Sequence, residues 1–163
     1  MKKLVFVLLA AGALGALGLL PFRAVDAAKL LPVKTVIVTK SGDEFTVDIG
    51  AGVQAVGRSL REALDRLREE VTGEVFLPTA EQVILTEPAD GALEAVAEER
   101  EFRPAAGIYR TPDPFPDPAA LGDYLDTHAS NVTILEVRAA LALGQQPKIP
   151  VIRRSEGGFL VDE

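Results

Sequence analysis

The 163-residue sequence contains no cysteine and a single histidine, His128. Without cysteine the chain can form no disulfide, no thiolate metal site, no cysteine nucleophile and no lipid anchor attached through sulfur. A nucleophile that needs an imidazole base would have to use His128, but the surrounding THAS lacks the glycines of a nucleophile elbow. We therefore interpret His128 as a surface residue at a helix end.

The acidic residues also lack the pattern of a catalytic or metal site. Four glutamates lie in and just after one short predicted helix: Glu94, Glu98, Glu99 and Glu101. Because they are spread around the helix, we interpret them as a solvated face rather than as a carboxylate pair directed at one bond. Asp113 and Asp117 lack the glycine and closing glutamate of a calcium loop. We predict that the protein is not an enzyme, with no catalytic residue, cofactor or metal.

Long hydrophobic runs are confined to the N-terminus. Two lysines precede an uncharged, mostly apolar stretch over residues 4–22. These residues would rise about 28 Å as a helix, close to the hydrocarbon thickness of a bilayer. The lysines would hold the N-terminus in the cytoplasm and place the rest of the chain outside. We predict a membrane anchor over residues 1–23; the alternative is a signal peptide cleaved after Ala27, which would leave a secreted domain.

The remaining chain, residues 24–163, is expected to form one exported domain. From Ala28 onward it has 14 basic and 23 acidic residues, a net charge of −9. Such an acidic domain repels phosphate backbones, so we expect no nucleic-acid partner. Its length is sufficient for a single compact domain with a hydrophobic core.

Alternating runs of β-branched residues predict an opening hairpin. KTVIVTK and EFTVDIG flank Ser41-Gly42-Asp43, a sequence typical of a tight turn. Further patterns predict helices over residues 53–71, 91–100, 118–129 and 133–143, strands over 74–77, 82–87 and 105–111, and a closing hairpin around 155–158. Helices that alternate with strands after an antiparallel hairpin predict an α/β (α+β) domain with a mixed sheet.

A glycine-rich turn follows the opening hairpin. Gly50, Gly52 and Ala55 occupy the three small-residue positions of a dinucleotide-binding loop. The preceding strand alternates polar and apolar residues, whereas the first strand of a dinucleotide fold is almost wholly apolar. The nearest acid at the end of a predicted strand, Glu87, lies 37 residues after Gly50 instead of about 20. We therefore interpret the turn as a flexible exit from the hairpin into a helix.

The segment TPDPFPDP, residues 111–118, predicts a stiff surface loop because its prolines cannot enter a helix interior or a central strand. Asp117 and Pro118 fit the N-cap and first position of the next helix. Phe115 lies in the middle of this loop and has two interpretations. It is a possible interface anchor displayed by the prolines, or its ring folds back onto the domain's own core.

The stretch FRAVDAAKLLPVKTVIVTK resembles the start of the Ger(x)C family, the lipoprotein C subunits of spore germinant receptors. Phe22 takes the family's tryptophan position, Asp26 its acid and residues 31–38 its first strand. The likeness continues in element order through QVILTE, EEREFRPAAGIYRT and the closing KIPVIRR-turn-GFLVDE. Pro21 replaces the lipid-bearing cysteine, so an uncleaved helix would have to provide the anchor. The family's later domains are not in this sequence.

The resemblance implies a membrane-anchored, externally facing, non-catalytic domain. It would act through protein contact in a spore germination or sporulation setting, with other membrane-bound germination proteins as candidate partners. One alternative is a small exported ligand-binding or enzymatic domain, with its site around Gly50–Gly52 and the proline loop. Another is a degenerate paralogue without a function of its own.

Overall fold

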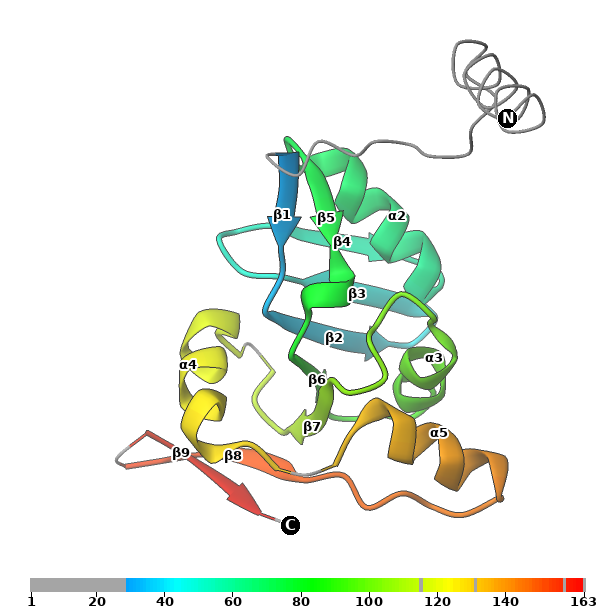
Figure 1. The fold of residues 1–163 in the computed structure, drawn as a ribbon, viewed down its shortest axis with the longest axis vertical. Helices are drawn as coiled ribbons and strands as arrows, with labels where there is room; N and C mark the ends of the chain where they lie inside the picture. Colours follow the sequence, from blue (N-terminus) through cyan, green and yellow to red (C-terminus); the bar gives the residue numbers. More distant parts are fainter. Residues whose placement is uncertain (1–28, 115, 131, 157, 163) are drawn as a thin grey trace, which may run out of the picture.

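The computed structural model describes residues 29–114, 116–130, 132–156 and 158–162 (Figure 1). Its strands are β1 (Leu30–Pro32), β2 (Thr35–Ser41), β3 (Glu44–Asp48), β4 (Gln54–Gly57), β5 (Glu74–Phe76), β6 (Gln82–Thr86), β7 (Gly107–Thr111), β8 (Val151–Ser155) and β9 (Gly158–Asp162). Its helices are α2 (Leu60–Glu70), the 3₁₀ turn η2 (Leu77–Thr79), α3 (Ala92–Glu98), α4 (Pro118–His128) and α5 (Ile134–Ala142).

Seven strands form one mixed sheet in the order β4-β3-β2-β6-β7-β8-β9. The four central strands, β2, β6, β7 and β8, run parallel, and the outer strands pair antiparallel with their neighbours. β1 and β5 form a separate parallel pair. Every residue of the central strand β6 is buried, as expected for a strand covered on both faces. The predicted mixed α/β single domain is confirmed.

Both predicted hairpins are present at the expected positions. β2 and β3 pair with Ser41 opposite Glu44, so Gly42 and Asp43 form the turn, and Gly42 has the positive φ of 59° that favours glycine. At the end of the described chain β8 and β9 pair with Ser155 opposite Gly158. The two hairpins therefore supply the antiparallel margins of a sheet whose centre is parallel.

Helices cover both faces of the sheet. Figure 1 shows α2, α3 and α5 on one side and α4 on the other. On the first side, buried residues of the three helices, such as Leu64, Val96 and Val137, belong to the larger core. The smaller core joins α4 to the opposite face and consists of Ile37, Ile84, Tyr109, Leu121, Leu125 and Ile152. The layers are helix, sheet and helix, with α4 alone on its face among the described helices.

The helix predicted over residues 53–71 is wrong in its first third. Gln54–Gly57 forms β4, which pairs antiparallel with β3, and α2 begins only at Leu60. Ser59 is the N-cap, because its hydroxyl accepts the Glu62 backbone N–H at 3.1 Å. Val56, which a helix over residues 53–71 would place on the same face as Leu60 and Leu67, is instead 40% exposed on the strand. The apolar face of α2 itself is buried and consists of Leu60, Ala63, Leu64 and Leu67.

The first strand expected over residues 31–38 is also divided. Leu30–Pro32 pairs with β5 outside the main sheet, and the main-sheet strand β2 begins at Thr35. Between them, the Val33 N–H donates to the Thr79 hydroxyl at 3.0 Å, while that hydroxyl lies 3.1 Å from the Val33 carbonyl. This side-chain bridge to η2 holds the chain where it leaves one sheet for the other.

The interpretation of the four glutamates as a solvated face is wrong for Glu99. Glu94 and Glu98 are exposed, but α3 ends at Glu98, and Glu99 turns inward with 6% of its surface exposed. Its carboxylate accepts from Arg61 of α2 at 3.0 Å. Glu101 is similarly paired with Arg68. These ion pairs join α2 to the segment after α3, a structural role that the local charge pattern did not indicate.

Within the described ranges, no helix is long and apolar enough to cross a membrane. Residues 4–22, over which the membrane anchor is predicted, lie outside the described residues. The structure therefore leaves that prediction untested.

Candidate functional site

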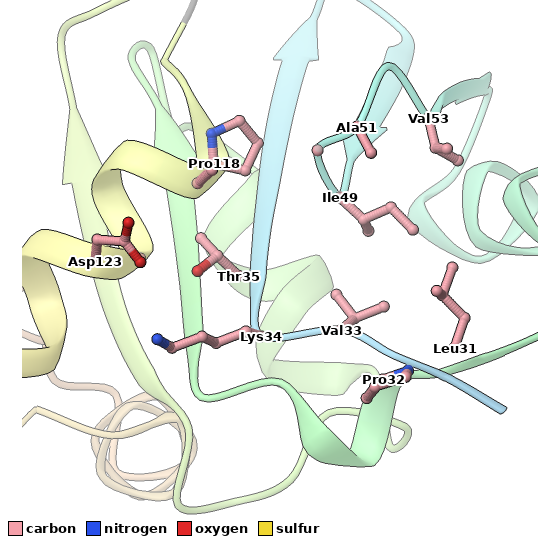
Figure 2. A pocket seen from close by; sticks show the side chains of 13 residues that line it. Leu31, Pro32, Val33, Lys34, Thr35, Ile49, Ala51, Val53, Pro118 and Asp123 are labelled. Atoms are coloured by element: carbon pink, nitrogen blue, oxygen red, sulfur yellow. The ribbon is translucent and has the colours of Figure 1, made fainter. Parts of the chain in front are cut away.

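Three segments that are distant in the sequence surround one apolar pocket of about 380 Å³ (Figure 2). They are residues 31–35 at the entry into β2, residues 49–53 between β3 and β4, and the first turns of α4. Figure 2 shows Ile49 and Val33 facing the space from two of these segments, with Pro118 at the start of the third. Aliphatic side chains and backbone therefore form most of its walls. We call this site the apolar pocket.

The glycine-rich turn forms one wall because of its unusual backbone. Gly50, Ala51 and Gly52 have φ values of 84°, 54° and 76°, and Ala51 is the one non-glycine with positive φ among the described residues. The Gly50 N–H donates to the Asp48 carboxylate at 2.7 Å, and the Val53 N–H donates to the Gly50 carbonyl at 2.9 Å. The turn links antiparallel strands, and no helix N-terminus follows it. A dinucleotide loop has a different geometry, as the sequence interpretation held, but the expected exit into a helix is wrong because the turn leads into β4.

The start of α4 forms a second wall. Asp117 is the N-cap, accepting the Ala119 N–H at 3.0 Å, and Pro118 is the first helical residue, as predicted. A Cβ on Gly50 would lie 3.6 Å from Pro118 Cβ, so the turn and the helix are nearly in contact. A Cβ on Gly122 would lie 2.5 Å from the Thr35 hydroxyl oxygen, so α4 can lie against β2 only with glycine there.

Charged groups lie at one margin of the pocket. Lys34 is exposed and forms an ion pair with Asp126 of α4. The hydrogen bond to Asp126 raises the pKa of Lys34, and the nearby charges of Asp126, Asp123 and Glu81 act in the same direction against partial desolvation. Lys34 is therefore a fixed cation beside the apolar walls, and its charge is already partnered.

The chemistry available at the apolar pocket is that of binding an apolar group. His128 does not line the apolar pocket; its ring is exposed and stacks on Tyr124 with centroids 4.3 Å apart, consistent with the predicted surface position at a helix end. Among the described residues there is no group of three or more histidines and acids that could hold a metal ion. What the pocket presents is a largely apolar space bordered by one ion pair, which suits an apolar side chain or a small apolar ligand.

The sequence-based expectations about the site have mixed outcomes. The structure places Gly50, Ala51 and Pro118 in the walls of one pocket, close to where the alternative ligand site was expected. Phe115, the candidate interface anchor, lies outside the described residues. Sequence reasoning missed the contribution of Leu31–Thr35, because the pattern there indicated only a strand.

A second exposed apolar surface lies on α5. Leu135 and Leu143 are 58% and 73% exposed, and the exposed Ala139 lies between them in the sequence. The helix buries its other face through Ile134 and Val137. We call Leu135, Ala139 and Leu143 the α5 surface.

Comparisons with protein-family models, curated proteins and solved structures found no match to this chain.

Proposed function

We propose that this protein is a membrane-anchored, externally facing domain that acts without catalysis, through protein contact, in a spore germination or sporulation setting. The apolar stretch over residues 4–22 supports the anchor, and the resemblance to the N-terminal domain of the Ger(x)C family supports the setting. Other membrane-bound germination proteins are the partners that this setting suggests.

The apolar pocket is the observation that carries the contact proposal. It has a volume of about 380 Å³ and is walled mainly by aliphatic side chains, including Leu31, which is 40% exposed. Interfaces gain most of their energy where a large side chain of one partner fills a pocket of the other. Fully burying one leucine or phenylalanine side chain contributes about 1.5–3 kcal/mol. The pocket can receive one such side chain from a partner.

A pair of substitutions tests where the contact is made. Ala119 is exposed on the first turn of α4 and lines the pocket, so Ala119→Trp should fill the pocket without disturbing the core. Ala139→Trp places the same side chain on the α5 surface. We expect Ala119→Trp to abolish recovery of the membrane partner and the associated spore phenotype at normal protein levels, while Ala139→Trp leaves both intact. The reverse pattern would assign the contact to the α5 surface instead.

A small exported ligand-binding domain is the second candidate function. The observation that favours it is the pocket volume, which lies within the range of small-molecule sites. A ligand that binds only the folded state raises its stability by RT ln(1 + [L]/Kd). Thermal-shift screening of nucleosides, amino acids and sugars distinguishes the two functions. A shift that Ala119→Trp removes favours the ligand, whereas no shift across the panel favours protein contact.

A further inference from the structure

A polar notch of about 350 Å³ lies beside the last turns of α4, separate from the apolar pocket. Its lining includes Gln82, Arg103, Tyr109 and Ser130, with the acids Glu81 and Asp126. We call this site the polar notch. Thr35 and Lys34 line the apolar pocket and bind Gln82 and Asp126 of the notch, so these contacts separate the two sites.

Tyr109 supplies a buried hydroxyl to the notch. The residue is 1% exposed, and its hydroxyl oxygen accepts the Ser130 backbone N–H at 3.0 Å. Its ring folds back over Gly107, where a Cβ would lie 2.9 Å from the ring and 3.0 Å from the hydroxyl oxygen. Burial raises the pKa of the hydroxyl, which keeps its proton. That proton has no acceptor among the described residues, so the hydroxyl can donate into the notch.

Gln82 supplies a second donor next to it. The residue is 5% exposed, and its side-chain oxygen accepts the Thr35 hydroxyl at 3.0 Å. Its amide nitrogen has no acceptor within the described part of the chain. Gln82 is the register partner of Gly107, over which the Tyr109 hydroxyl lies, so the two donors are adjacent. Arg110 Nε is the one buried side-chain polar atom without a partner among the described residues, so the unpartnered Gln82 amide nitrogen is accessible to solvent in the notch.

The charges around the notch leave one cation available. Lys34 neutralises Asp126 through their ion pair. Glu81 is exposed just before β6, where water can solvate its charge. Arg103 is exposed and forms no ion pair with any described residue. Two neutral donors are therefore combined with one free guanidinium.

From this geometry we propose that the polar notch is a binding site for a small carboxylate, independent of the contact made at the apolar pocket. The carboxylate oxygens accept from the Tyr109 hydroxyl and the Gln82 amide, while Arg103 supplies the opposite charge. A carboxylate is an acceptor-only group, which matches a site where the Tyr109 hydroxyl and the Gln82 amide can both donate. A neutral carboxamide of the same shape would gain only the uncharged hydrogen bonds, and an ammonium would find no acceptor at these donors.

The proposal can be tested with three probes of nearly equal size: propionate, propionamide and propylammonium. The full chain, ¹⁵N-labelled and kept in a nonionic detergent, is titrated with each probe at constant ionic strength, and amide chemical shifts are followed. We expect saturable shifts at Gly107 and Ser130 with propionate alone. Equal binding of propionamide, or no saturable shift at these amides with propionate, would overturn the proposal.

Two variants and one control assign the contact to the named groups. Arg103→Met and Tyr109→Phe should each weaken propionate binding about tenfold, since hydrogen bonds to charged groups are among the stronger ones. Arg103→Met removes only an exposed side chain, so it tests the proposal even where Tyr109→Phe lowers stability. Arg100→Met removes an exposed cation of the same segment between α3 and β7 that does not line the notch, so it should leave binding unchanged. Equal affinity in Arg103→Met and the native chain would contradict the proposal.

Discussion

Replacing Gly57 by alanine should destabilise the domain strongly, because β4 and α2 touch backbone to backbone at this residue. A Cβ on Gly57 would lie 2.4 Å from the Ala63 nitrogen and 2.8 Å from the Glu62 carbonyl carbon. Real Cβ contacts are essentially never shorter than 3.0 Å, so either the strand or the helix must move. The atoms in the way belong to the helix backbone, which cannot rotate aside as a side chain can.

The loss of stability in Gly57→Ala depends on the core contacts that α2 would lose if it moved away from β4. Ala63 and its helix neighbours Leu60, Leu64 and Leu67 are all buried in the larger core. Overpacking of a dense core costs about 1–3 kcal/mol, and the backbone contact places this change at the upper end, about 3 kcal/mol. For a domain of this size, such a loss lowers Tm by about 10 °C.

Urea unfolding of Gly57→Ala, followed by circular dichroism, measures this loss. Gly42→Ala is the matched control, because a Cβ there meets nothing within 4 Å and only the positive φ of 59° is strained. That control should cost about 1 kcal/mol. If Gly57→Ala were no less stable than Gly42→Ala, the close packing of β4 on α2 would be wrong.

Three further predictions concern the anchor, the histidine and a tyrosine. N-terminal sequencing of membrane-fraction protein should find the anchor retained, and a mature chain that begins at Ala28 would contradict this. His128→Ala should leave fold and phenotype unchanged, because the exposed ring contacts mainly Tyr124 and its neighbours; a specific loss of function at normal protein levels would refute the non-catalytic interpretation. In a Tyr124→Phe variant, absorbance at 295 nm should show Tyr109 ionising above the usual value of 10.0, since burial raises its pKa. The Tyr109 hydroxyl ionises at a lower pH in the unfolded chain than in the folded domain. Its contribution to the free energy of unfolding should therefore be lost as pH rises above about 10.

Local sequence signals predicted the elements whose boundaries depend on local chemistry. The Ser41-Gly42-Asp43 turn and the Asp117-Pro118 helix start are examples, because turn and cap geometry depends on adjacent residues. β4 was missed because Val53, Ala55 and Val56 fit both a short strand and the apolar face of a helix. The decisive signal was Ser59 followed by Glu62, which is typical of a helix start and falls after β4.

Other features could not be predicted because they depend on contacts between distant segments. Glu99 is buried only because α3 ends one residue earlier and Arg61 of α2 lies opposite it. The apolar pocket requires the β1–β2 connection, the Gly50 turn and the start of α4 to meet, and nothing local in Leu31–Thr35 indicates that meeting. The polar notch depends on the ring of Tyr109 lying over Gly107.

Site-specific photo-crosslinking from the rim of the apolar pocket tests the central claim most directly. A photoreactive amino acid at Leu31, which is 40% exposed, should give one discrete protein adduct in intact membranes, and Ala119→Trp in the same chain should remove it. The same probe at Leu143 on the α5 surface should give no such adduct. No adduct from Leu31, or one that persists when Ala119→Trp fills the pocket, would contradict the claim that this protein acts through a protein contact at the apolar pocket.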